Sequence, residues 1–201
     1  MRVDHVSIGA RLEAIEAIGL QVTPSAGGGH ARMHLGGVYV EISGPGRKPD
    51  GAHASAWYLR PADMGVCVSE LRRRGLAVSD VTPYRGFDGR WLDSHLNAPA
   101  LGNAVPVLTR RITTRPWPPP LTRPHPNGVR GLKELHVATA LPQQLIALLV
   151  LLGAAQRADH AVRFQDAVEI LAVSPLDAHS GPVAIVLDRG AKPPLRMDLP
   201  H

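Results

Sequence analysis

Apolar residues recur along this chain with two spacings, one typical of half-buried strands and one typical of the inner face of a helix. Residues 3–8 alternate between polar and apolar side chains, which predicts a strand. Residues 11–18 carry apolar side chains at helical spacing and are followed by Gly19, which predicts a short helix. Further strands are predicted over residues 20–22, 31–35 and 38–43. The predicted order of this first part is β-α-β-β-β.

The same order of elements is predicted twice more along the chain. One set has strands over residues 56–60, 76–81, 90–96 and 105–112 with a helix over 62–74, and the other has strands over 132–139, 161–164, 167–173 and 182–188 with a helix over 141–152. The fold class is therefore α+β, with repeated βαβββ modules over residues 2–44, 56–112 and 131–188. Consecutive prolines predict a linker over residues 113–130, and a peripheral tail is expected over residues 189–201.

The composition limits the classes of function. The single cysteine, Cys67, excludes an internal disulfide and a cysteine-based zinc cluster. The formal net charge is +5, but no basic stripe with interleaved aromatic residues is present, so we expect no nucleic-acid binding. The chain begins directly with a strand-like run and has no apolar segment long enough to cross a bilayer. We therefore expect no signal peptide, no membrane contact and a cytoplasmic location.

Two of the modules carry one histidine in an early strand and one glutamate in a late strand. His5 precedes Glu41 by 36 residues, and His136 precedes Glu169 by 33 residues. Successive side chains of a strand point to opposite faces, and both pairs lie opposite apolar positions that a helix would cover. The alternation groups Val3 with His5 on the open face. A set of two histidines and two glutamates suits a divalent metal.

Several short segments resemble the vicinal-oxygen-chelate superfamily, which includes glyoxalase I, extradiol dioxygenases and bleomycin-resistance proteins. The first module opens with Asp4-His5-Val6 and closes with Tyr39-Val40-Glu41-Ile42. The nearer likeness is to bacterial glyoxalase-like domain proteins, and it extends to about residue 187. The other segments that carry it are Gly28-Gly29-His30, Trp57-Tyr58-Leu59-Arg60, Arg90-Trp91, Pro106-Val107-Leu108 and His125-Pro126-Asn127-Gly128.

The resemblance implies that two βαβββ modules pair into a cup-shaped mixed β-sheet with the helices on the outside. It also implies a divalent metal (Zn, Fe, Mn or Ni) inside the cup, held by histidines of first strands and glutamates of last strands. In this sequence these ligands would be His5, Glu41, His136 and Glu169, and Glu41 would also be the candidate catalytic base.

Arginine and tryptophan residues in the strands of the cup are candidates for substrate binding, because a guanidinium can bind a carboxylate or phosphate through two hydrogen bonds. These candidates are Arg60, Arg90, Arg110, Trp57 and Trp91.

Three modules offer two ways to build one cup. Pairing the first with the second leaves His5 and Glu41 without a second pair, because the second module carries neither residue at the matching positions. Pairing the first with the third would unite all four residues. We favour the sequential pair, because neighbouring units usually pack together. The third module would then be appended to the cup or would meet a partner chain, as in a homodimer.

Three functions remain open at this point. The first is a metal-dependent isomerase, lyase or dioxygenase that acts on a small oxygenated molecule. The second is a metal-free protein that binds or sequesters such a molecule, as the resistance proteins of the superfamily do. The third is an interaction module whose docking surface is the third module. The sequence does not identify the substrate.

Overall fold

The computed structural model contains two β-sheets that share one apolar core. It describes residues 1–24, 30–43, 56–86, 89–112, 124–165, 168–174 and 180–199. Most of the linker expected at residues 113–130 lies outside these ranges, as do Gly28 and Gly29 of the segment Gly28-Gly29-His30. No helix in the described part of the chain is long and apolar enough to span a membrane.

The larger sheet has eight strands in the order β2-β3-β4-β1-β5-β8-β7-β6. These are β1 (Arg2–Gly9), β2 (Thr23–Pro24), β3 (His30–Leu35), β4 (Val38–Ser43), β5 (Ala56–Arg60), β6 (Thr82–Gly86), β7 (Gly89–His95) and β8 (Val107–Ile112). The smaller sheet has six strands in the order β10-β11-β12-β9-β13-β14. These are β9 (Gly131–Ala138), β10 (Ala155–Ala158), β11 (Ala161–Arg163), β12 (Glu169–Val173), β13 (Gly181–Asp188) and β14 (Leu195–Asp198). The helices are α1 (Leu12–Ala17), α2 (Met64–Arg73), the 3-10 helix η1 (Pro99–Ala104) and α3 (Pro142–Leu151).

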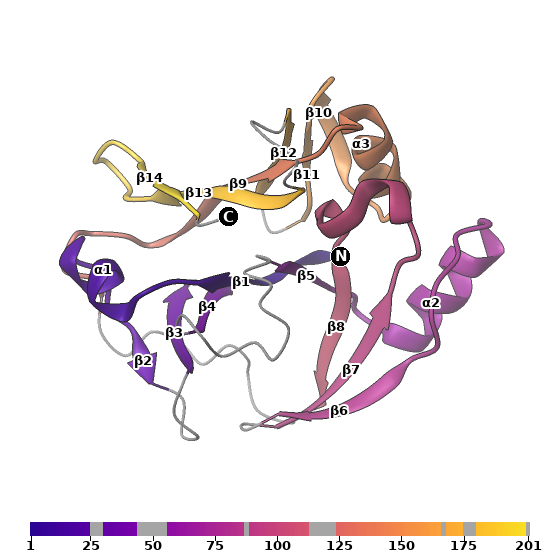
Figure 1. The fold of residues 1–201 in the computed structure, drawn as a ribbon, viewed down its shortest axis with the longest axis horizontal. Helices are drawn as coiled ribbons and strands as arrows, with labels where there is room; N and C mark the ends of the chain where they lie inside the picture. The colour runs from indigo at the N-terminus through magenta and orange to yellow at the C-terminus, as the bar shows by residue number, and fades with distance from the viewer. Residues whose placement is uncertain are drawn as a thin grey trace.

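One strand pair joins the two halves of the larger sheet. Strand β1 pairs in parallel with β4 on one side and antiparallel with β5 on the other. Strand β5 in turn pairs in parallel with β8. The strands of residues 2–43 and 56–112 therefore lie in a single curved sheet, with the β1–β5 pair at its centre (Figure 1).

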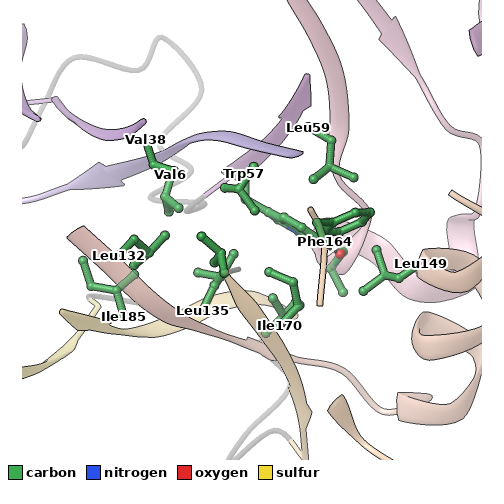
Figure 2. Packing of buried hydrophobic residues seen from close by; sticks show 14 of the residues in the cluster. Val6, Val38, Trp57, Leu59, Leu132, Leu135, Leu149, Phe164, Ile170 and Ile185 are labelled. Carbon is green, nitrogen blue, oxygen red and sulfur yellow. Dashed lines mark hydrogen bonds between the residues drawn. The ribbon is translucent and has the colours of Figure 1, made fainter. Parts of the chain in front are cut away.

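The smaller sheet packs its apolar face against the outer face of the larger sheet. Figure 2 shows side chains of the larger sheet, among them Val6 and Trp57, facing Leu135 and Ile170 of the smaller sheet. All four are completely buried. In Figure 1 the smaller sheet lies above β1 and β5, with α1 and α2 at the two sides of the larger sheet. The core therefore occupies one face of the larger sheet and leaves the inner, concave face to other side chains.

Helix α2 begins and ends at residues suited to those positions. The side chain of Asp63 accepts a hydrogen bond from the backbone N–H of Val66 at 2.9 Å and caps the first turn. The helix buries Met64, Val68 and Leu71. Gly75 follows it with a φ of +83°, a left-handed conformation that glycine adopts without strain. The predicted helix over 62–74 is thus present, but it begins at Met64, directly after its cap, and ends at Arg73.

The prediction of a strand over residues 76–81 is wrong. Only an isolated bridge between Val78 and Leu96 forms there, and the next strand, β6, begins at Thr82. The guanidinium of Arg72 donates two hydrogen bonds to the carbonyl of Val78, at 3.2 and 2.9 Å. This carbonyl is thus held by a helix side chain, and no regular ladder extends along the segment.

A buried histidine explains why residues 20–22 do not form the predicted strand. The Nδ1 atom of His125 accepts a hydrogen bond from the backbone N–H of Gln21 at 2.9 Å. In the neutral ring the proton is then on Nε2, which donates to the carbonyl of His34 at 2.8 Å. His125 therefore links the segment before β9 to the first module through two hydrogen bonds. The backbone N–H of Gln21 is thereby occupied, and β2 begins only at Thr23.

The expected peripheral tail contains a strand. Leu195–Asp198 forms β14, which pairs antiparallel with β13. Met197 and Leu199 are buried, so apolar side chains alternate here as they do in the other strands. Pro193 and Pro194, which come just before this segment, favoured the prediction of an irregular tail over that of a strand.

Replacing Leu135 by Ala should test the packing between the two sheets. Leu135 is completely buried at the centre of the interface, so the loss of its side chain should lower the free energy of unfolding by about 2–5 kcal/mol. Urea titration monitored by circular dichroism measures this change. The matched control is Leu151→Ala on α3, where the side chain is 41% exposed and the cost should be below about 1 kcal/mol. Equal effects of the two substitutions would contradict the packing described.

Candidate functional site

The candidate site is the concave face of the larger sheet, here called the cup face. It comprises the side chains that alternate with the core residues on six strands, β1, β3, β4, β5, β7 and β8. Strand register places Tyr39 and Tyr58 beside His5, Glu41 beside Ser7, Arg32 beside Glu41, and Trp91 beside Arg111. With Asp93 and Thr109, which are also register partners, these residues make up the cup face: His5, Ser7, Arg32, Tyr39, Glu41, Tyr58, Trp91, Asp93, Thr109 and Arg111.

A bulge at Asp4 determines how β1 contributes to this face. Val3 pairs with Leu59 and His5 pairs with Tyr58, so one residue of β1 is extra relative to β5. Because Leu59 is completely buried, Val3 lies on the core side, opposite His5. The grouping of Val3 with His5 predicted from strict alternation is therefore wrong, since a bulge shifts the alternation by one residue.

The bulge also brings together two consecutive side chains, which a regular strand would hold on opposite faces. The Nδ1 atom of His5 lies 2.9 Å from a carboxylate oxygen of Asp4. The other oxygen of Asp4 lies 3.0 Å from Nε of Arg60. The Asp4 side chain is 1% exposed, so this carboxylate is buried between a guanidinium and an imidazole.

The ring of His5 lies between two tyrosine rings. Its centroid is 3.9 Å from that of Tyr58 and 4.6 Å from that of Tyr39, and in both pairs the ring planes are nearly parallel, at 12° to each other. The ring of Trp91, three strands away in the sheet, lies 6.4 Å away and is tilted by 60°. The curvature of the sheet thus gathers four rings from β1, β4, β5 and β7 at the bottom of the cup face.

Glu41 lies on the same face but is not the direct neighbour of His5. In the parallel ladder between β1 and β4, Glu41 is opposite Ser7, and His5 is opposite Tyr39. The Ser7 hydroxyl donates to the Glu41 carboxylate at 3.3 Å, and a guanidinium nitrogen of Arg32 lies 3.4 Å from it. Glu41 is therefore paired with a cation and held at the β3 side of the aromatic rings.

The phenol of Tyr58 is held in its neutral form. Burial raises the pKa of this phenol, and the nearby carboxylate of Glu41 raises it further, followed by that of Asp93. A neutral phenol can donate a hydrogen bond to an oxygen atom of a ligand.

Arginines flank the aromatic rings at both ends of the cup face. The guanidinium carbon of Arg32 lies 5.5 Å from the centre of the Tyr39 ring, and that of Arg111 lies 5.5 Å from the centre of the Trp91 ring. The cup face thus combines a row of aromatic rings with two cationic ends. This arrangement can bind a small, oxygenated, negatively charged molecule.

Several residues predicted to bind substrate lie elsewhere. Trp57 is completely buried in the core, and its Nε1–H donates to the carbonyl of Ala104 at 2.9 Å. Arg90 and Arg110 pair with Ile112 and Leu92 and thus have the opposite orientation to Trp91 and Arg111. Arg60 lies on the same side of β5 as Tyr58, and its guanidinium pairs there with Asp4. Of the five predicted residues, Trp91 and Arg60 therefore lie on the side of the sheet that forms the cup face.

The structure separates His136 and Glu169 from His5 and Glu41. Both belong to the smaller sheet, where Leu135 and Val137 are completely buried in the core and His136 lies on the opposite face. His136 there contacts Glu134 at 3.1 Å. Since the core lies between the two sheets, the two His/Glu pairs lie on faces that point away from each other.

Strand register shows that the two pairs are not equivalent. Glu41 is opposite the residue two positions after His5, whereas Glu169 is opposite Glu134, two positions before His136. Along the strand, Glu41 is therefore displaced from His5 toward the C-terminal end of β1, whereas Glu169 is displaced from His136 toward the N-terminal end of β9. The similar spacings along the sequence conceal this difference. Arg163 is the partner of Glu169, at 3.5 Å.

Eight residues on or beside the cup face were not predicted: Asp4, Ser7, Arg32, Tyr39, Tyr58, Asp93, Thr109 and Arg111. The alternation of side chains along β8 could have identified one of them. The apolar Leu108 faces the core, so Arg111, three positions later, must face the cup. Tyr39 lies two positions before Glu41 and therefore on the same face, so it could have been identified in the same way. The role of Asp4 could not have been identified from the sequence, because it depends on the bulge.

The donor atoms of the cup face do not fit a divalent metal. In the described part of the chain no group of three or more His, Cys, Asp or Glu side chains is close enough to share one ion. His5 and Glu41 would need at least one further ligand. The strands β5 and β8, where the resemblance implies that ligand, present Tyr58, Thr109 and the cation Arg111 instead.

Comparison with known proteins gives a family and a fold. A family profile described as a glyoxalase-like domain matches residues 3–153. No sequence among the curated proteins matches the chain significantly.

Similar solved structures include a hypothetical protein from Staphylococcus aureus, with a TM-score of 0.59 and 9% identity over 90% of this chain and 87% of that one. A homoprotocatechuate 2,3-dioxygenase from Arthrobacter globiformis has a TM-score of 0.56 and 12% identity over 86% of this chain and 60% of that one. An Mn(II)-bound glyoxalase from Novosphingobium aromaticivorans has a TM-score of 0.54 and 11% identity over 90% of this chain and 63% of that one. This chain thus spans less than two thirds of the last two proteins, and at these identities the likeness concerns the fold alone.

Replacing Glu41 by Gln should lower the pKa of Tyr58 toward its ordinary value, because a negative charge beside the phenolate is removed. Burial remains, so the pKa should stay above that value. Ultraviolet titration of each protein, with a Tyr58→Phe variant subtracted, measures this shift. Glu169→Gln, on the other sheet, is the matched control and should leave the titration unchanged. An unchanged curve for Glu41→Gln would show that this carboxylate does not face Tyr58.

Proposed function

The chain belongs to the glyoxalase-like domain family of the vicinal-oxygen-chelate superfamily. From this premise we propose that it binds a small oxygenated anion on its cup face. The protein's own side chains, rather than a metal, would hold this anion. The observation that carries this proposal is the row of aromatic rings around His5 with Arg32 and Arg111 at its ends.

The chemistry of the row favours a planar ligand with an acidic group. Aromatic rings offer flat apolar surface, and tilted or offset contacts between rings add stabilisation beyond the burial of area. A guanidinium beside this surface can bind a carboxylate through charge-assisted hydrogen bonds, which are about twice as strong as neutral ones. The neutral phenol of Tyr58 supplies a donor for a further ligand oxygen. An aromatic carboxylic acid combines these features.

A metal-dependent reaction is the second candidate, and the fold of the Mn(II)-bound glyoxalase is the observation that favours it. In that reading His5 and Glu41 would be ligands of Mn, Zn, Ni or Fe, and Glu41 would act as the base. Against it stand the ion pair between Glu41 and Arg32 and the tyrosine and arginine at the remaining positions. We therefore place binding by the protein's own side chains first.

Binding of 4-hydroxybenzoate, measured by calorimetry and by tryptophan fluorescence, tests the proposal. Arg111→Gln removes a charge from the cup face and should weaken binding by about tenfold or more, since a hydrogen bond to a charged group contributes about 1.5–3 kcal/mol. The matched control is Arg110→Gln, the adjacent residue on the opposite face, which should change the affinity by less than about twofold. Equal losses in both variants, or no binding by the native protein, would contradict the proposal.

Thermal unfolding with added metals separates the two candidates. Without a metal site, Mn(II), Zn(II), Ni(II) and Fe(II) should shift the Tm of the native protein no more than that of the Glu41→Gln variant. A rise in Tm that this substitution abolishes would favour the metal-dependent candidate, because a ligand that binds only the folded state stabilises it.

A further inference from the structure

The buried Asp4 lies outside every set of residues so far given a role in ligand binding, yet it directly contacts His5. Its two carboxylate oxygens have different neighbours, with Nδ1 of His5 2.9 Å from one and Nε of Arg60 3.0 Å from the other. Among the described residues, the contact with Asp4 is the only hydrogen bond of the His5 ring.

The chemistry of these three groups fixes the position of the proton on His5. An ionised carboxylate is only an acceptor, and this one lies beside a guanidinium, which always carries its charge. Nδ1 of His5 must then be the donor in its contact with Asp4. In the neutral ring this leaves Nε2, the nitrogen farther from the strand, as an acceptor.

The surroundings of the ring preserve this orientation. Tyr39 and Tyr58 stack on its two faces, and its side chain is only 7% exposed. The ring therefore cannot turn over without displacing both tyrosines and breaking the contact with Asp4. The bulge in β1 is what allows consecutive residues to make this contact.

We propose that Asp4 is a positioning residue that presents Nε2 of His5 to the cup face as a hydrogen-bond acceptor, so that the site selects ligands carrying a hydroxyl group. This inference rests on the proposed function, in that the ligand occupies the cup face. It adds a specificity: a hydroxyl donates to Nε2 while an acidic group of the same ligand binds an arginine. A matched ligand without the hydroxyl leaves Nε2 without a partner and binds more weakly.

Nitrogen-15 NMR of the ligand-free protein, recorded at a pH at which the His5 ring is neutral, tests the positioning role without reference to any ligand. His5 is assigned by the loss of its signals in a His5→Gln variant. We expect a protonated, pyrrole-like Nδ1 and an unprotonated, pyridine-like Nε2. A neutral ring protonated on Nε2 would overturn the proposal.

Replacing Asp4 by Asn should invert the tautomer. The amide has one acceptor and one donor group, and only the acceptor can face the guanidinium of Arg60. Its NH₂ group then faces His5, so Nδ1 must become the acceptor and the proton must move to Nε2. Asp4→Glu retains an acceptor-only side chain and should keep the native tautomer. A role of Asp4 in stability alone would leave the tautomer of a folded Asp4→Asn protein unchanged, and this result would overturn the proposal. Should this variant fail to fold, the tautomer of the native protein and of Asp4→Glu still decides the question.

Paired probes test the specificity. The native protein should bind 4-hydroxybenzoate at least about tenfold more tightly than benzoate. Asp4→Asn should reduce this ratio while retaining its binding of benzoate, because Nε2–H can then only donate to the weakly accepting phenol oxygen. Equal affinities of the native protein for the two probes would overturn the inference. Failure to bind either probe, with the expected tautomer intact, would count against the proposed function and leave the positioning role of Asp4 supported.

Discussion

The antiparallel pairing of β1 with β5 is the constraint on which the rest of the structure depends. It joins the strands of the first two βαβββ segments into one curved sheet and thereby creates a single concave face. The same pair carries the apolar side chains, Val6 and Trp57 among them, against which the smaller sheet packs. One strand junction thus organises the core on one side and the candidate binding surface on the other.

The bulge within this junction links the two faces chemically. Without it, Asp4 would point toward the apolar core, where an isolated charge is costly. With it, the carboxylate lies between Arg60 and His5, and each of its oxygens has a polar neighbour. The buried charge is thereby compensated, and the orientation of the most central cup residue is fixed at the same time. Strand irregularities of this kind are common where a sheet must aim a particular side chain.

Sequence reasoning predicted much of the fold because period-two and helical patterns are local. The predicted βαβββ order, the α+β class and the parity of Glu41 follow from alternation within single strands. What it missed depends on partners distant in the sequence: Arg72 holds the carbonyl of Val78, and His125 takes the N–H of Gln21. The register between β9 and β12 is likewise a tertiary property. For this reason the spacing of His136 and Glu169 suggested an equivalence with His5 and Glu41 that the paired strands do not have.

The strand β13 has a consequence for how modules of this kind can assemble. It pairs antiparallel with β9, as β5 does with β1, and so takes the position at which a further module would join the smaller sheet. Because β13 belongs to the same chain, this side of β9 is already paired from within the protein. Among the described strands, the free edges of the smaller sheet are therefore those of β10 and β14, so that a second cup centred on β9 would require the displacement of β13.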